Sequence, residues 1–194
     1  METKTSYFKN TGKENTDEVL RIAKKRADEL GIKTVLVAST SGETAVKAME
    51  VFKGMKVIVV THCAGFRQPD IQEFTEENRK IVQSKGGIML TAAHAFGGLS
   101  RSMRQSSIPE APTTYIIGDI VATTLRTFGE GMKVVCEIAV MAADAGLART
   151  DEEVISIAGT GKSGGSDTAV VLRPANAHRY FDLRVKEILC KPHF

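Results

Sequence analysis

Apolar residues repeat along this chain with two spacings, one typical of buried strands and one typical of amphipathic helices. The uninterrupted apolar run at 35–38 predicts a buried strand of a parallel sheet. After a polar turn at 39–44, apolar residues return at i, i+3, i+4 and i+7, which predicts a helix with one buried face. The residues that carry this helical spacing are Ala45, Ala48, Met49 and Phe52.

The same two patterns alternate along most of the chain. Predicted helices cover 17–30, 45–52, 75–85, 115–128 and 132–145, with a further short helix inside 99–113. Predicted strands cover 34–38, 57–61, 87–91, 153–158, 168–172 and 183–189. Gly31 and Gly86 directly follow two of the helices, where a glycine commonly ends a helix. Residues 1–15 are polar, and we expect this tail to fold back or to fray.

Strands alternate with helices for two-thirds of the chain and then follow one another directly. This order predicts a single α/β domain over 1–194, with three layers and a mostly parallel central sheet. Helices are expected on both faces, and antiparallel strands are expected near the C-terminus. In such sheets ligands bind beyond the carboxyl ends of the strands. The loops after residues 38, 61, 91 and 158 are therefore expected to converge.

The turn that follows the first buried strand is rich in hydroxyl groups. The first amides of a helix have no partner within the helix and lie at the positive end of its dipole. Such amides, together with several hydroxyls, predict a cradle for a phosphate, and glycine allows a ligand to approach the backbone. The alternative is an ordinary Ser/Thr-rich turn that caps its helix. The residues of the predicted cradle are Ser39, Thr40, Ser41, Gly42, Glu43 and Thr44.

This turn also carries a resemblance to a known family. After an apolar strand, 40–45 resembles the phosphate-holding loop of the C-terminal α/β domain of pyruvate kinase. The similarity is good over 16–90 and looser beyond. The chain as a whole resembles the stand-alone family named after that domain, because 158–162 and 173–178 match its closing pattern. That match is the reason to consider Asn176 and His178 as site residues.

The resemblance implies a bound flavin mononucleotide (FMN) and no established reaction. Pyruvate kinase transfers its phosphoryl group in a separate barrel domain, which these 194 residues do not supply, so we expect no kinase activity. Glu43 stands where the enzyme's effector loop commonly has a basic or neutral residue. A carboxylate there repels a second phosphate, so a monophosphate is favoured over a sugar bisphosphate.

Composition narrows the classes of protein to consider. Apolar content of 42% and charged content of 25% are typical of a soluble globular protein. The net charge of +3 is too small to favour nucleic acid, and no apolar run reaches the ~20 residues that span a bilayer. No signal peptide is evident at the N-terminus. Cys63, Cys136 and Cys190 form no CxxC pair, which favours reduced thiols in the cytoplasm.

Two other predicted loops offer polar and aromatic side chains to the same edge. His62 and His94 each follow a predicted strand, and a neutral imidazole there could donate to a ring carbonyl or accept a proton. We expect only one of the two to touch a ligand. Phe66, beside Gly65, and Phe96 either stack on a flat ligand or fill the cleft. Alternative anion partners are Arg67, Arg101 and Arg104.

The glycine-rich loop at 159–167 fails both nucleotide-binding motifs. A P-loop needs a glycine five places before Gly161, where the chain has Ser156, and a strand rather than a helix follows the loop. The loop is either a mobile solvent loop or a contributor to the ligand site, through a lysine that offsets ligand charge. The candidate residues are Gly159, Thr160, Gly161 and Lys162.

Three hypotheses follow from these patterns. The first is an FMN-binding protein in the cytoplasm, acting as a flavin-dependent oxidoreductase. The second is a non-catalytic sensor for a phosphorylated metabolite. The third is a homo-oligomeric scaffold, in which the alanine-rich helix at 132–145 is either core or interface. No metal site is expected, because no set of three or four ligands is apparent.

Overall fold

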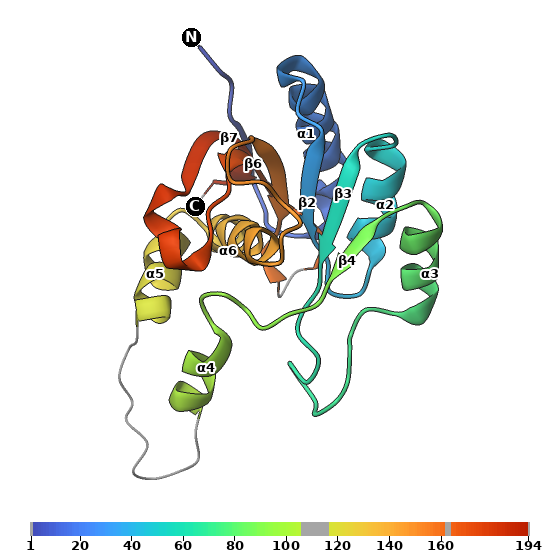
Figure 1. Ribbon diagram of the computed structural model, residues 1–194. Helices are drawn as coiled ribbons and strands as arrows, with labels where there is room; N and C mark the ends of the chain where they lie inside the picture. The colour runs from blue at the N-terminus through green and yellow to red at the C-terminus, as the bar shows by residue number, and fades with distance from the viewer. Residues whose placement is uncertain (1, 106–116, 162–163, 194) are drawn as a thin grey trace.

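The computed structural model describes residues 2–105, 117–161 and 164–193, and over these ranges the chain forms one seven-stranded sheet (Figure 1). The order of its strands is β1-β7-β6-β5-β2-β3-β4. Their bounds are β1 (Ser6–Phe8), β2 (Thr34–Ala38), β3 (Lys56–Val60), β4 (Ile88–Leu90), β5 (Val154–Ala158), β6 (Thr168–Arg173) and β7 (Arg184–Pro192).

The directions of the strands confirm the predicted mixture. In the centre of the sheet, β2 pairs in parallel with both β3 and β5, and β3 pairs in parallel with β4. Near the C-terminus, β6 runs antiparallel to both β5 and β7. The carboxyl ends of β2, β3, β4 and β5 therefore lie at one edge of the sheet, and β6 begins at that same edge.

The N-terminal tail contains a strand that the sequence pattern did not indicate. Ser6 pairs with Cys190 and Phe8 with Pro192, so that β1 extends the sheet beside β7. Of the two expectations for this tail, folding back and fraying, the structure confirms the first. A three-residue strand whose partner lies at the other end of the chain leaves too short a pattern to be recognised.

Helices cover both faces of the sheet, which confirms the three-layer prediction (Figure 1). Val35 and Val37 of β2 face the core under α1, α2 and α3, whereas Leu36 faces the core under α6. This alternation follows from the two-residue period of a strand. The helices are α1 (Thr16–Leu30), α2 (Glu43–Val51), α3 (Glu76–Ser84), α4 (Gly98–Gln105), α5 (Ile117–Arg126) and α6 (Glu130–Asp144), with short 3-10 turns η1 (Lys13–Asn15) and η3 (Ala177–Asp182).

The alanine-rich helix α6 belongs to the core. All but three of its fifteen residues are buried, and it packs against β2, β5 and β6. Ser156 of β5 donates a hydrogen bond from its hydroxyl to the carbonyl oxygen of Val135, at 3.0 Å. Of the two expectations for this helix, core and interface, the structure supports the first. In the described ranges, no helix is both long and apolar enough to cross a membrane.

Asp167 ties the N-terminal segment to the loop between β5 and β6. Its side chain is fully buried, and its Oδ2 accepts hydrogen bonds from the amides of Gly12 and Thr160, both at 3.1 Å. Its Oδ1 accepts a third bond from the hydroxyl of Thr168 at 2.9 Å. A buried carboxylate is tolerated only when its oxygens are bonded in this way. Asp167 thus fixes the shape of the loop at the carboxyl edge of the sheet.

We expect Asp167→Ala to lower the free energy of unfolding by about 2–4 kcal/mol, because two backbone donors would be left without their acceptor. Asp167→Asn keeps one acceptor and should lose less. The measurement is chemical denaturation at pH 7. As a control, exposed Asp151→Ala should change stability by less than about 1 kcal/mol. Equal losses for Asp167→Ala and Asp151→Ala would contradict the role given to Asp167.

Candidate functional site

The turn between β2 and α2 presents open backbone donors at the carboxyl edge of the sheet. Its first amide, that of Ser39, donates to the carbonyl oxygen of Val60, and the amide of Ala45 donates to the hydroxyl of Ser39 at 3.4 Å. The five amides of residues 40–44 lie between these two. None of the five donates to an acceptor among the described residues. These amides lie at the positive end of the α2 dipole, where a negative charge is stabilised.

Gly42 is required by packing within the protein. Its φ is +104°, and a Cβ at this position would lie 2.5 Å from the Cβ of Asn78 and 2.9 Å from the ring of Phe74. The neighbouring carbonyl oxygen of Ser41 accepts hydrogen bonds from the amide of Thr75 and the side chain of Asn78. The sequence predicts that Gly42 lets a ligand approach the backbone. The structure shows a second reason for glycine here, which is the close approach of Phe74 and Asn78 at the start of α3.

The hydroxyls of the turn differ in what they can offer. Ser39 is buried and engaged by the amide of Ala45, and Thr44 is also buried. Thr40 and Ser41 are half-buried, and Glu43 is exposed. A ligand at this turn would therefore meet amides and the hydroxyls of Thr40 and Ser41, with the carboxylate of Glu43 beside them.

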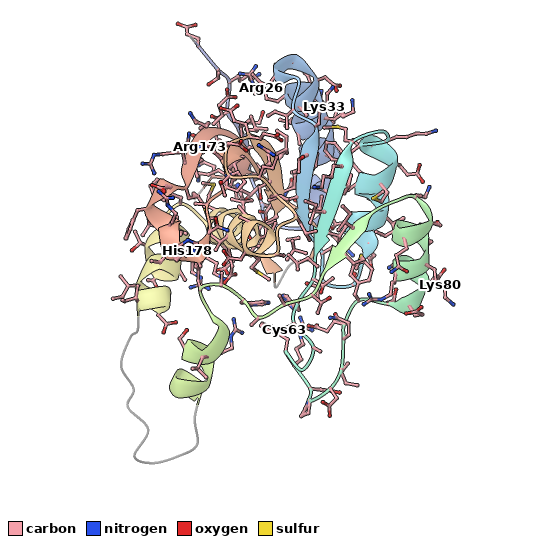
Figure 2. The ribbon with its side chains drawn as sticks, viewed as in Figure 1. Arg26, Lys33, Cys63, Lys80, Arg173 and His178 are labelled. Carbon is pink, nitrogen blue, oxygen red and sulfur yellow. The ribbon has the colours of Figure 1, made fainter. Side chains whose placement is uncertain are left out.

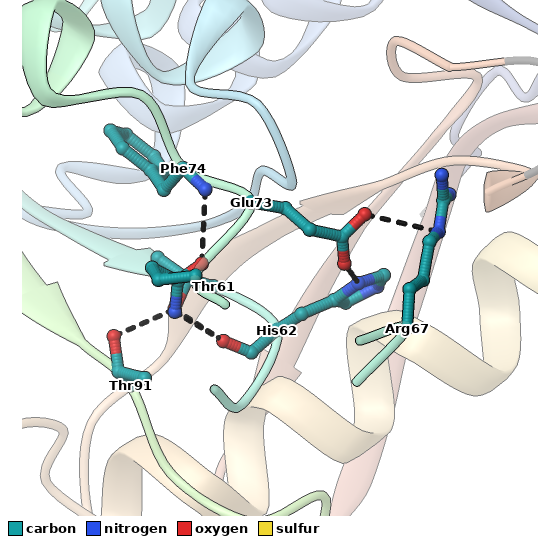
Figure 3. Close-up of polar contacts among 7 residues, drawn as sticks. Thr61, His62, Arg67, Glu73, Phe74 and Thr91 are labelled. Atoms are coloured by element: carbon teal, nitrogen blue, oxygen red, sulfur yellow. Dashed lines mark hydrogen bonds and ion pairs between the residues drawn. The ribbon is translucent and has the colours of Figure 1, made fainter. Parts of the chain in front are cut away.

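His62 is held by a carboxylate that the sequence analysis did not single out. Nδ1 of His62 lies 2.8 Å from Oε2 of Glu73, and Oε1 of Glu73 lies 3.0 Å from Nε of Arg67; Figure 3 draws both contacts. Because a carboxylate accepts, this contact favours a proton on Nδ1 and leaves Nε2 as the basic nitrogen. Glu73 follows His62 by eleven residues in an irregular loop, a spacing that matches no catalytic motif.

The loop that carries His62 is braced from within. Gln72 donates from its side-chain amide to the carbonyl oxygen of His62 at 2.9 Å, and its side-chain oxygen accepts from the amide of Phe74. Gly65, with φ of +76°, donates from its amide to the carbonyl oxygen of Ile71. Gly65 thus makes the tight turn that directs Phe66 toward His62.

Three rings and one guanidinium form a cluster at the same edge, which we call the ring cluster (His62, Phe66, His94 and Arg101). The ring centroids of His62 and Phe66 are 4.1 Å apart, and those of Phe66 and His94 are 5.1 Å apart. The guanidinium of Arg101 lies over Phe66, 4.4 Å from its centroid. The two histidines lie 5.3 Å apart, so they share one environment. The side chain of Arg104 is outside the described part of the structure.

Phe96 points into the protein and lies outside this cluster. It is 7% exposed, packs in the core under α6 and meets the ring of Tyr180 edge to face. Its amide donates to Oε1 of the buried Glu137, which also pairs with Lys133 one helical turn away. The stacking role considered for Phe96 is therefore not available in this conformation. The sequence did not indicate that Glu137 and Lys133 are buried, because the surrounding residues of α6 follow an apolar helical pattern.

The buried pair on α6 contributes to the electrostatics at His94. Burial lowers the pKa of His94 to about 4, and Glu137 opposes this effect. His62, Lys133 and Arg101 add to the lowering, because each disfavours a second positive charge nearby. His94 is therefore neutral at physiological pH and can both donate and accept a hydrogen bond.

The loop between β5 and β6 folds back on itself. A Cβ on Gly159 would lie 2.5 Å from the carbonyl oxygen of Gly165, and the amide of Thr160 is taken by Asp167. Gly161 is exposed. Lys162 lies outside the described residues. Because β2 and β5 are neighbours, this loop and the turn at 39–44 lie at the same edge of the sheet. The close packing at Gly159 and the amide bond of Thr160 are, however, contacts within the loop itself.

The closing segment lies elsewhere. Asn176 donates from its side chain to Asp144 at the C-terminal end of α6, and the exposed His178 belongs to η3. Neither residue is grouped with the ring cluster. In the described ranges, no three His, Cys, Asp or Glu residues are grouped as metal ligands.

Comparison with known families agrees with this architecture. A family model described as "Pyruvate kinase, alpha/beta domain" matches residues 17–172. The match begins in α1 and runs to β6, so that it includes the turn at 39–44 and the ring cluster.

The low pKa of His94 predicts how stability depends on pH. Between pH 6.5 and about 4 the unfolded chain binds a proton that folded His94 does not bind, so the free energy of unfolding falls as pH drops. This contribution is fully present above pH 6.5. When the pH is lowered from 7.5 to 5, the free energy of unfolding of His94→Asn should therefore fall by about 2 kcal/mol less than that of the wild type.

Urea denaturation at the two pH values measures this difference. His178→Asn, an exposed histidine on η3, serves as the matched control and should follow the wild type. Coincident pH slopes for the wild type and His94→Asn would show that His94 is not desolvated. Because only the difference in slope is compared, a constant loss of stability in the variant does not affect the result.

Proposed function

The chain belongs to the pyruvate kinase alpha/beta domain family, and on that premise we propose that it binds a phosphorylated small molecule, FMN in the first instance, at the carboxyl edge of the sheet. The observation that carries the proposal is the run of amides at 40–44, for which the described residues supply no acceptor. In the proposal, these amides hold one phosphate at the start of α2.

The fit of a flavin rests on the neighbours of this turn. Thr75 donates from its amide to the carbonyl oxygen of Ser41, and Glu73, two residues earlier, contacts His62. The segment 73–75 therefore links the turn to the ring cluster. A flat heteroaromatic ring needs aromatic contact and hydrogen-bond donors. In the proposal, Phe66 supplies the first, and either His62 or the neutral His94 supplies the second. When bound, the flavin would supply electron and hydride transfer, and the protein would supply orientation and electrostatics.

Glu43 favours a monophosphate within this proposal. Its exposed carboxylate lies in the first turn of α2, where it stabilises the helix dipole and repels a ligand with two phosphates. Arg101, which lies over the ring of Phe66, can balance part of the charge of one phosphate, whereas Arg67 is already paired with Glu73. The proposed setting is the cytoplasm, which fits the free thiols of Cys63, Cys136 and Cys190.

The direct test is the identity of the bound molecule. We expect the purified protein to release FMN on denaturation, identified by mass and by flavin absorbance, and FMN to raise the melting temperature of the stripped protein. Riboflavin should raise it less, because it lacks the phosphate. Colourless preparations with no response to FMN would end the flavin proposal. Release of a different phosphorylated metabolite would favour the alternative, a non-catalytic sensor that uses the same amides.

A charge variant tests where the phosphate lies. Glu43→Gln removes the negative charge beside the amides and should tighten FMN binding about two- to fivefold at low ionic strength. Riboflavin affinity should not change. The measurement is fluorescence titration with each ligand. Glu152→Gln makes the same charge change at the opposite edge and should leave both affinities unchanged. An equal effect of Glu43→Gln on the two ligands would place the phosphate elsewhere.

A further inference from the structure

A polar cavity lies at the edge of the sheet opposite to the candidate site. It has a volume of about 400 Å³, within the usual range for small-ligand sites. Its wall follows the exit of β6 into η3, the closing segment that the proposed function leaves without a task. The lining residues are Thr150, Arg173, Pro174, Ala175, Asn176, Arg179 and Asp182.

We propose that this cavity is a binding site for a small oxyanion, namely inorganic phosphate or the phosphate group of a small metabolite, with Arg173 as its principal ligand. The inference is independent of the FMN proposal. It rests on the partners of the charged groups around the cavity, on the rigidity of the wall and on the position of Arg173 across from a second arginine.

Within the described ranges, the guanidinium of Arg173 has no bonding partner. It is half-buried, and no described residue supplies a carboxylate or carbonyl oxygen within bonding distance of its guanidinium. A guanidinium presents five N–H donors, and two of them match two oxygens of one phosphate. An arginine that lines a cavity without a protein acceptor is suited to an anion that comes from solution.

The position of Arg173 strengthens this argument. Arg173 of β6 stands directly opposite Arg184 of β7 in the antiparallel pair. Like charges at opposed positions destabilise a sheet. Arg184 donates to the carbonyl oxygens of Phe181 and Leu183, which does not neutralise its charge. A bound oxyanion would relieve the repulsion between these two arginines.

The acidic groups around the cavity are already engaged. Asp182 pairs with Nε of Arg179 at 3.1 Å, which leaves the other nitrogens of Arg179 open to the cavity. Asp144 accepts from the side chain of Asn176 at 3.1 Å and from the amide of Ala177 at 3.0 Å. Asp151 and Glu152 both pair with Arg149. Each of these carboxylates therefore has a partner other than Arg173.

The wall behind Arg173 is rigid enough to hold a site. Pro174 and Ala175 are buried, and proline fixes the backbone directly after Arg173. The two bonds of Asp144 pin the next residues to the end of α6. A preorganised wall lowers the entropic cost of binding a small ligand.

The cavity and the turn at 39–44 are separate. β6 starts beside the end of β5 at the carboxyl edge, and Leu172 pairs with Val154 at the other edge. A strand of this length spans roughly 17 Å. Figure 2 shows Arg173 near the upper edge of the sheet and Cys63, beside His62, near the lower one. One phosphate cannot reach both places.

The test is a titration of the full chain with inorganic phosphate, at constant ionic strength set by chloride, followed by the backbone amide signals in NMR spectra. We expect saturable shifts at residues 173–179. Arg173→Gln should weaken this binding at least about tenfold, the loss expected for a charge-assisted hydrogen bond. Arg173→Lys keeps the positive charge but loses the paired N–H donors of the guanidinium, so it should weaken phosphate binding less than Arg173→Gln does.

Arg149→Gln is the matched control, because it removes the same charge beside Thr150 from an arginine already paired with carboxylates. It should change the affinity less than twofold. Equal weakening by Arg149→Gln and Arg173→Gln, or no saturable shift at 173–179, would overturn the proposal. Phosphate-dependent shifts at 40–44 report on the other site, so failure of one proposal is distinguishable from failure of the other. The amide spectrum of each variant also verifies its fold.

Discussion

The parallel pairing of β2 with both β3 and β5 is the constraint on which the rest of this structure depends. Parallel strands must be joined by crossovers, and their carboxyl ends must lie at one edge. This pairing alone brings together the turn before α2, the loop of His62 and the loop after β5. Burial of apolar residues on both faces of β2 stabilises the pairing. The loops at the edge contribute little to this core, so their side chains can be polar.

Buried charges give those loops their shape. Asp167 fixes the loop after β5, and Glu137 fixes the backbone at Phe96, each through amide donors that would otherwise be unsatisfied. A buried carboxylate is costly to desolvate, so such residues stabilise the fold only while every bond is made. The same reasoning explains why His94, close to Glu137 and Lys133, stays neutral: burial outweighs the attraction of one carboxylate.

Much of the architecture could be predicted from local patterns. The α1 helix and its end at Gly31, the central strands, and the turn before α2 all follow from periodicity and from the preferences of helix ends. These signals are readable because each depends on residues within a few positions of one another. The family resemblance pointed in the same direction, and the match over 17–172 bears it out.

Sequence by itself determined all the strands except β1, the apolar faces of the main elements and the positions of the polar loops, because those properties are carried by neighbouring residues. Only the tertiary structure decided which distant groups meet. It paired His62 with Glu73, turned Phe96 into the core and set Gly42 against Asn78. Among the described residues, it also left the guanidinium of Arg173 without an acceptor. These outcomes depend on how separate segments pack in space, and no spacing along the chain encodes them in a form that can be read directly.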